Sequence, residues 1–118
     1  MPTLAHTLAE RASNVDFERL GKQVTHETKR RVLDSIGCAL GAWKSRPAQV
    51  TRAVAQSVAV PKGASLFGSK HRTTADLAAF SNGALVRYLD FNDTYLSKEP
   101  AHPSDNIPAA LAAGQAAG

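Results

Sequence analysis

Apolar residues recur at spacings of three and four along most of the chain, a pattern that predicts helices. The clearest stripe begins beyond Thr25, a candidate N-cap, and runs to Trp43. Its members are Val32, Leu33, Ile36, Ala39, Leu40 and Trp43. Because one helical pattern follows another along the chain, we predict an all-α fold of five or six helices.

Capping residues and helix breakers set the boundaries that we expect for the other elements. Ser45 and Pro47 suit a helix start, and Pro108 suits the first turn of the last helix. In chain order, the predicted elements are a helix over 3–12, a turn over 17–20 capped by Asp16, a helix from 25 to 43, a helix from 45 to about 60, an extended segment over 64–70, a helix from 75 to about 90 capped by Thr73 or Thr74, a loop over 91–104 and a helix from Asp105 or Asn106 onward.

The composition fits one globular domain. The chain has 118 residues, of which 43% are hydrophobic and 20% charged, enough apolar side chains for a packed core. We therefore expect residues 1–118 to form a single helical domain. No apolar run approaches the roughly 20 residues that span a bilayer, and no secretory signal is recognisable. The lone Cys38 excludes an internal disulfide and favours a cytoplasmic location, with this thiol packed in the apolar helix.

The charge balance gives little support to nucleic acid as a partner. The net charge is +4 and the pI about 9.6, which is compatible with an anionic ligand. However, basic residues cluster only at Lys29-Arg30-Arg31, and none of the few aromatic residues is interleaved with them. We expect neither nucleic acid nor a membrane as a partner, and favour a small polycarboxylate.

Groups able to do chemistry gather between the last two predicted helices. Asp90 and Thr94 are four residues apart, so they would share a face if the helix continued through them, and His102 follows across a loop. An imidazole near a carboxylate can act as a general acid or base at neutral pH. Dehydration of a β-hydroxy acid needs such a group, plus donors for the carboxylates, which Lys98, Arg87 or the start of the last helix would supply.

Each of these residues also has a purely structural interpretation. Asp90 and Asp93 can end a helix and cap a turn, Thr94 can be a turn residue, and a histidine before proline is often a surface loop residue. Other chemistries have less support: a single cysteine and the absence of a His/Glu pair at ligand spacing predict no metal site, and no glycine-rich phosphate loop is present.

Two runs, AAFSNGALVRYLDFNDT at 78–94 and HPSDNIPAALAAG at 102–114, resemble the MmgE/PrpD family. The runs RRVLDSIGCALGAW and SLFGSKHRTTADLAAF add weaker similarity. The family includes 2-methylcitrate dehydratases, cis-aconitate decarboxylases and an iminodisuccinate epimerase. Its members are several times longer than this chain, so the resemblance implies the N-terminal part of such a protein and of its larger helical domain.

The resemblance also implies site residues. The catalytic pattern falls on Asp90, Thr94 and His102, and we expect Asp93, Lys98 and Ser104 to contact substrate. The segment between Thr94 and His102 looks longer than in the decarboxylase members, which argues mildly against decarboxylation. Further family groups, a second histidine, lysines and a tyrosine, lie beyond the matching region, so we do not expect this polypeptide alone to turn over substrate.

The functional expectation is a cofactor-independent lyase acting on a small di- or tricarboxylate, with 2-methylcitrate-type dehydration as the leading case and a homodimer implied by resemblance. One alternative is an iminodiacid epimerase, which removes the same kind of carbon-bound proton without losing water. Another is a non-catalytic helical fragment or interaction module, which would expose apolar faces and tend to associate.

Overall fold

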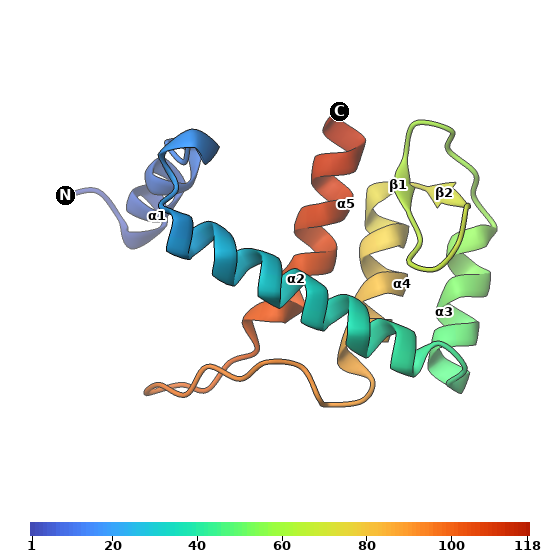
Figure 1. Cartoon of the computed structure of the whole chain (residues 1–118). Helices are drawn as coiled ribbons and strands as arrows, with labels where there is room; N and C mark the ends of the chain where they lie inside the picture. Colours follow the sequence, from blue (N-terminus) through green and yellow to red (C-terminus); the bar gives the residue numbers. More distant parts are fainter. The chain divides into compact units, whose positions relative to one another are not determined.

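A computed structural model describes all residues, 1–118, and the chain divides into two compact units, residues 1–30 and residues 31–118. The single domain expected from the sequence stays a prediction. The all-α expectation is confirmed, because the only strands are two of two residues each. The elements are α1 (Leu4–Ser13), the short 3-10 helix η1 (Phe17–Arg19), α2 (Lys22–Ala42), α3 (Arg46–Gln56), β1 (Ala64–Ser65), β2 (Arg72–Thr73), α4 (Ala75–Arg87), the 3-10 helix η2 (Pro103–Asn106) and α5 (Ile107–Ala117) (Figure 1).

The first unit is organised by local caps. The Thr3 hydroxyl accepts a hydrogen bond from the His6 N–H at 3.2 Å and so starts α1. Asp16 caps η1 in the same way, as predicted, by accepting from the Glu18 N–H at 3.1 Å. Helix α1 buries no residue.

Helix α2 differs from the prediction in its start and in its buried face. The Thr25 N–H already donates to the Gly21 carbonyl at 3.1 Å, so Thr25 lies within the helix and is not its N-cap. The large apolar residues of the stripe are not those that the chain buries: Leu33 is 71% exposed and Leu40 60%. The buried face is made of small side chains, namely Ser35, Cys38, Ala39 and Ala42. The expectation of a packed Cys38 thiol is confirmed.

Small side chains also form most of the core of the second unit. One cluster contains Ala39, Ala42, Ala48, Leu85 and Val86, with Trp43 and Phe67 packed against it. The other, which we name the alanine core, joins α3, α4, α5 and β1 and contains Ala55, Ala64, Leu66, Ala78 and Ala112. Helices α3, α4 and α5 lie side by side in Figure 1, and their alanines let them approach closely.

The predicted extended segment forms a small hairpin. Ala64 pairs with Thr73 in an antiparallel register. The connecting turn contains Gly68 at φ 67°, where a Cβ atom would come within 2.8 Å of the Trp43 ring. Only glycine combines this left-handed backbone with so close an approach.

A buried asparagine on α4 forms hydrogen bonds with the backbone of the hairpin. The Asn82 side chain is 2% exposed; its Oδ1 accepts from the Phe67 N–H at 2.9 Å and its Nδ2 donates to the Ser65 carbonyl at 3.0 Å. These bonds satisfy peptide groups that a two-residue strand leaves unpaired. The hairpin is therefore fixed to α4 through a polar side chain inside the core.

Helix α4 ends earlier than predicted. Its last helical residue is Arg87, and Asp90 takes a left-handed backbone conformation at φ 52°. Aspartate tolerates this conformation better than most residues, and the Asp90 side chain turns back to form an ion pair with Arg87. Asp90 and Thr94 consequently do not share a helix face, which corrects that part of the prediction.

The last helix begins close to its predicted start. The 3-10 turn η2 precedes α5, with Asn106 at the N-cap position and Pro108 in the first turn.

Ser45 caps α3, as predicted, by accepting from the Ala48 N–H at 3.3 Å. None of the helices combines the length and apolar character that a membrane crossing requires.

Candidate functional site

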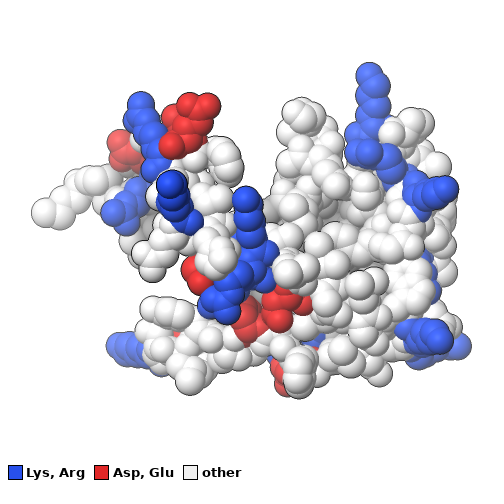
Figure 2. Space-filling view, viewed as in Figure 1, with Lys and Arg blue, Asp and Glu red and all other residues white.

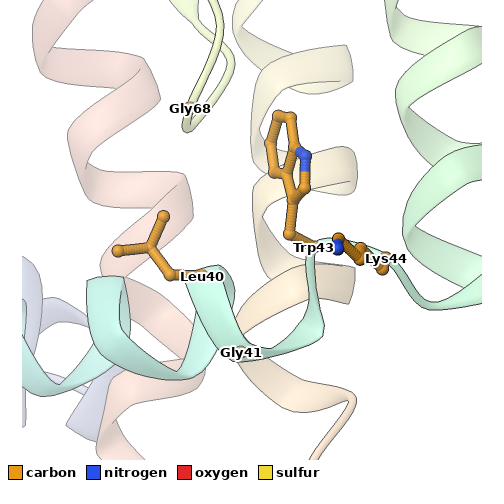
Figure 3. A pocket seen from close by; sticks show the side chains of 5 residues that line it. All are labelled: Leu40, Gly41, Trp43, Lys44 and Gly68. Atoms are coloured by element: carbon orange, nitrogen blue, oxygen red, sulfur yellow. The ribbon is translucent and has the colours of Figure 1, made fainter.

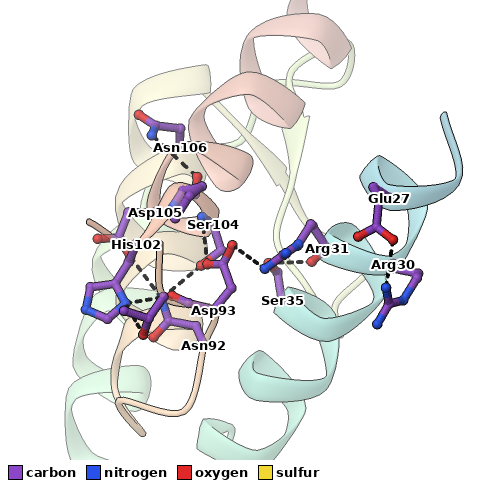
Figure 4. A network of polar contacts seen from close by, with 12 residues as sticks. Glu27, Arg30, Arg31, Ser35, Asn92, Asp93, His102, Ser104, Asp105 and Asn106 are labelled. Carbon is purple, nitrogen blue, oxygen red and sulfur yellow. Dashed lines mark hydrogen bonds and ion pairs between the residues drawn. The ribbon is translucent and has the colours of Figure 1, made fainter. Parts of the chain in front are cut away.

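The loop between α4 and η2 brings together several of the predicted site residues (Figure 4). The Nδ1 atom of His102 lies 2.7 Å from the backbone carbonyl of Asp93 and 3.5 Å from the hydroxyl of Thr94. A backbone bridge between Tyr95 and Ala101 closes the loop that separates these groups in sequence. His102 is half-buried and Thr94 is exposed, so both lie at the surface of this unit.

The carboxylate of Asp93 is held from two sides. Its Oδ1 accepts from the backbone N–H of Ser104 at 3.0 Å, and its Oδ2 accepts from the Arg31 guanidinium at 3.0 Å. The Asp93 side chain is only 5% exposed, whereas that of Arg31 is 50% exposed. Asp93 thus ties the loop to the start of η2 and to α2.

A second set of bonds reinforces the same junction. The Nδ2 of Asn92, a buried residue, donates to the Ser104 hydroxyl at 2.8 Å and lies 3.3 Å from a carboxylate oxygen of Asp105. The Oδ1 of Asn92 accepts from Arg87 at 3.4 Å. We call Arg31, Asn92, Asp93, Thr94, His102 and Ser104 the polar cluster.

The electrostatics of Asp93 keep it ionised. Burial of this carboxylate raises its pKa, but hydrogen bonds from the Ser104 hydroxyl and N–H and the charge of Arg31 outweigh burial. The pKa of Asp93 therefore lies below its ordinary value of 3.8. At neutral pH the cluster contains a fixed negative charge facing a fixed positive one.

Asp90 lies at the edge of this arrangement. Its side chain is 74% exposed and pairs with Arg87, whose Nε also lies 3.9 Å from a carboxylate oxygen of Asp105. The hydrogen bond from Arg87, together with its charge, lowers the pKa of Asp90, and the charge of His102 acts in the same direction. No hydrogen bond joins Asp90 to Thr94 or His102.

The three residues expected to contact substrate have different environments. Lys98 is exposed in the loop, where it forms no hydrogen bond or ion pair. Ser104 is 1% exposed and bonded to Asn92 and Asp93. Both carboxylate oxygens of Asp93 also have protein partners. Of the three, only Lys98 presents a free charged group to solvent.

Sequence reasoning missed Arg31 and Asn92. In the sequence, Arg31 is one of three consecutive basic residues, and its contact with Asp93 joins residues 62 positions apart. Asn92 lies between Asp90 and Asp93 and has no ionisable group, so a search for acids and bases does not select it. A signal for Asn92 did exist, because an asparagine in a turn often bonds to nearby polar groups.

A separate pocket lies at the end of α2. It has a volume of about 420 Å³ and is lined by Leu40, Gly41, Trp43, Lys44 and Gly68 (Figure 3). None of these belongs to the polar cluster, and the Arg52 guanidinium stacks on the Trp43 ring at 3.9 Å from its centroid.

Neither a metal site nor, on the face shown in Figure 2, a continuous basic patch over α3, α4 and the hairpin is present. No group of three or more His, Cys, Asp or Glu side chains is arranged to hold a metal ion. On the face shown in Figure 2, the part that carries α3, α4 and the hairpin has its Lys and Arg side chains at separate places and not in one continuous patch.

Comparisons with known proteins give a consistent assignment. A family model described as the MmgE/PrpD N-terminal domain matches residues 6–118. The 2-methylcitrate dehydratase of Cupriavidus necator is 41% identical over 92 residues, which are 75% of this chain and 19% of the relative. That of Escherichia coli K12 is 36% identical over 96 residues, 79% of this chain and 20% of the relative.

The match also extends to a eukaryotic protein. The mitochondrial 2-methylcitrate dehydratase of Yarrowia lipolytica is 32% identical over 113 residues, 94% of this chain and 22% of the relative. The chain spans about a fifth of the length of the curated relatives it matches. From residue 6 to residue 118, this chain belongs to the MmgE/PrpD family as its N-terminal domain.

Proposed function

We propose that the protein, at its full length, is a dehydratase that removes water from a small hydroxylated di- or tricarboxylate such as 2-methylcitrate, without a metal or organic cofactor. The observation that carries the proposal is the polar cluster, in which a histidine with one restrained ring nitrogen lies beside a threonine hydroxyl. The names of the relatives support the same reaction class.

Dehydration requires two proton transfers. A base removes a proton from the carbon next to a carboxylate, a double bond forms, and the hydroxyl on the adjacent carbon leaves as water after an acid protonates it. We assign one of these transfers to the Nε2 atom of His102, because the Nδ1 atom is bonded to the Asp93 carbonyl. The other transfer needs a second acid or base.

The remaining site residues would bind and orient substrate. Thr94 lies beside the His102 ring and can donate its hydroxyl proton to a substrate oxygen. Asp90 is ionised and exposed, and its carboxylate can accept a hydrogen bond from a substrate hydroxyl. Lys98 supplies a positive charge for a substrate carboxylate, a role less open to Arg87, which is already bonded to Asp90 and Asn92.

Product analysis tests this proposal. The full-length protein is incubated with 2-methylcitrate in deuterated water, and products are followed by NMR and mass spectrometry. We expect an unsaturated tricarboxylate, with loss of the mass of water. Stereochemical scrambling with deuterium uptake and no loss of water would replace dehydration by epimerisation. No turnover, together with no saturable binding of citrate-type acids, would remove the enzymatic proposal.

A further inference from the structure

We propose that Arg31 and Asp93 are positioning residues that fix the ring of His102 in one protonation form, with the hydrogen on Nδ1 and the lone pair on Nε2. The inference rests on the proposed function, since it assigns a purpose to the direction in which His102 is held. It adds Arg31 of α2, which is far from the loop in sequence, to the residues that act in the site.

His102 contacts the backbone carbonyl of Asp93 through its Nδ1 atom. A peptide carbonyl only accepts hydrogen bonds, and the Asp93 carbonyl lies 2.7 Å from Nδ1. Nδ1 must therefore carry a hydrogen in both the neutral and the charged ring. In the neutral ring the basic lone pair is then on Nε2. This is the minor neutral form of a free histidine side chain, so the protein has to select it.

The Asp93 carbonyl is held in place by hydrogen bonds of the Asp93 side chain. The backbone of Asp93 is fixed through its own carboxylate, which bonds to the Ser104 N–H at 3.0 Å and to Arg31 at 3.0 Å. Ser104 is two residues beyond His102, so the Asp93 to Ser104 bond closes the loop on both sides of the imidazole. The Asn92 to Ser104 bond at 2.8 Å repeats this closure.

Arg31 keeps the Asp93 carboxylate in its place through the ion pair. Because the carboxylate of Asp93 is 5% exposed, losing its cation leaves a nearly buried charge with fewer partners. The loop would then move to bring this carboxylate to water, and the carbonyl that faces His102 would move with it. Arg31 thus acts on His102 through Asp93, without touching the imidazole.

The chain offers a matched control. Arg30 is adjacent to Arg31 on α2, but its guanidinium bonds to Glu27 at 2.7 Å, within the first unit. Arg30→Ala and Arg31→Ala remove the same side chain from neighbouring helical positions. Only the second removes the contact with Asp93.

The test combines a spectroscopic and a kinetic readout on the full-length protein. Histidine ring nitrogens are labelled with ¹⁵N, and the His102 signals are assigned by comparison with His102→Gln. At a pH where the ring is neutral, we expect wild type and Arg30→Ala to show a protonated Nδ1 and an unprotonated Nε2. In Arg31→Ala we expect a mixture of the two neutral forms and a fall in kcat of about 10- to 100-fold, with a smaller change in KM.

Conservative variants keep the test decisive if Arg31→Ala folds poorly. Arg31→Lys keeps the charge and should retain most of the Nδ1–H form. Asp93→Asn keeps an acceptor for the Ser104 N–H but loses the ion pair, so its kcat should fall between those of wild type and Arg31→Ala. A protonated Nε2 in the wild type would overturn the proposal, as would Arg31→Ala having the spectrum and kcat of Arg30→Ala. The spectrum needs no substrate, so failure of the dehydratase assignment is recognised separately, by product analysis.

Discussion

In the alanine core, helices α3, α4 and α5 are held by methyl groups in close contact, whereas in the polar cluster a loop is held by hydrogen bonds and one ion pair. The core depends on shape, because its members have almost no exposed surface and little room for larger side chains. The polar cluster depends on particular donors and acceptors, because the loop between α4 and η2 forms neither a helix nor a named strand. The comparison indicates that the packed helices provide a frame for the loop, and exposed loops on such frames are where functional residues tend to lie.

The largest expected effect on stability comes from a residue that joins the two kinds of interaction. Asn82 is a polar side chain inside the core, and Asn82→Leu would leave the Phe67 N–H and the Ser65 carbonyl without partners. We expect a loss of roughly 2–4 kcal/mol in the free energy of unfolding, measured by urea denaturation. The control is Gln49→Ala, which removes an exposed amide bonded to the Lys44 carbonyl. Equal losses in the two variants would contradict the role given to Asn82.

Overpacking the alanine core should cause the second largest loss of stability. Ala55 is fully buried on α3, while Ala53 is exposed on the same helix. Ala55→Leu should lower the free energy of unfolding by about 1–3 kcal/mol, because the added atoms have no space. Ala53→Leu should change it by less than about 0.5 kcal/mol. If both variants were equally stable, close packing between these helices would not be what holds the core.

The polar cluster, unlike the core, should respond to pH. The folded-state pKa of Asp93 lies below its ordinary value of 3.8, so this carboxylate stabilises the fold fully above that value. Its contribution is lost as the pH falls through the folded-state pKa. Urea denaturation should show Asp93→Asn to be less stable than wild type at neutral pH, by about 1–2 kcal/mol because Arg31 is half-exposed. The difference should shrink in acid; one that did not change with pH would refute the electrostatic account.

The smallest effect on stability is expected from Asp90. Its pKa is also lowered, by the hydrogen bond from Arg87, so the sign of its pH dependence is the same as for Asp93. Its side chain is 74% exposed, however, and water screens the pair. In urea denaturation Asp90→Asn should therefore cost less stability than Asp93→Asn, while lowering kcat in the full-length protein. A stability loss larger than that of Asp93→Asn would place Asp90 among the structural residues.

The sequence predicted the helices better than it predicted their packing. Ser45, Asp16 and Pro108 indicated starts because caps act over a few residues. The face of α2 was not predictable from its apolar stripe, since this chain buries small residues such as Ser35 and leaves Leu40 exposed. Periodicity reports which residues are apolar, but not which neighbour each face will meet.

The sequence predicted that some residues of the polar cluster lie close together, but it did not predict how they are connected. Thr94 and His102 were expected near each other, and the loop places them 3.5 Å apart. Helix α4 ends before its predicted end near residue 90, because the sequence does not distinguish a left-handed aspartate from a helical one. The Arg31 to Asp93 contact joins positions 62 residues apart, a distance over which spacing rules do not apply.

A comparison of two histidines of the same unit, made in the full-length protein, tests whether the polar cluster carries the proposed chemistry. His102 lies in the polar cluster, and His71 lies at the hairpin, with its Nε2 2.9 Å from the Val58 carbonyl. With 2-methylcitrate as substrate, we predict that His102→Ala lowers kcat by a factor of about 100 or more, while His71→Ala has a kcat near that of wild type. A His102→Ala protein as active as wild type would show that the loop cluster does not carry the chemistry.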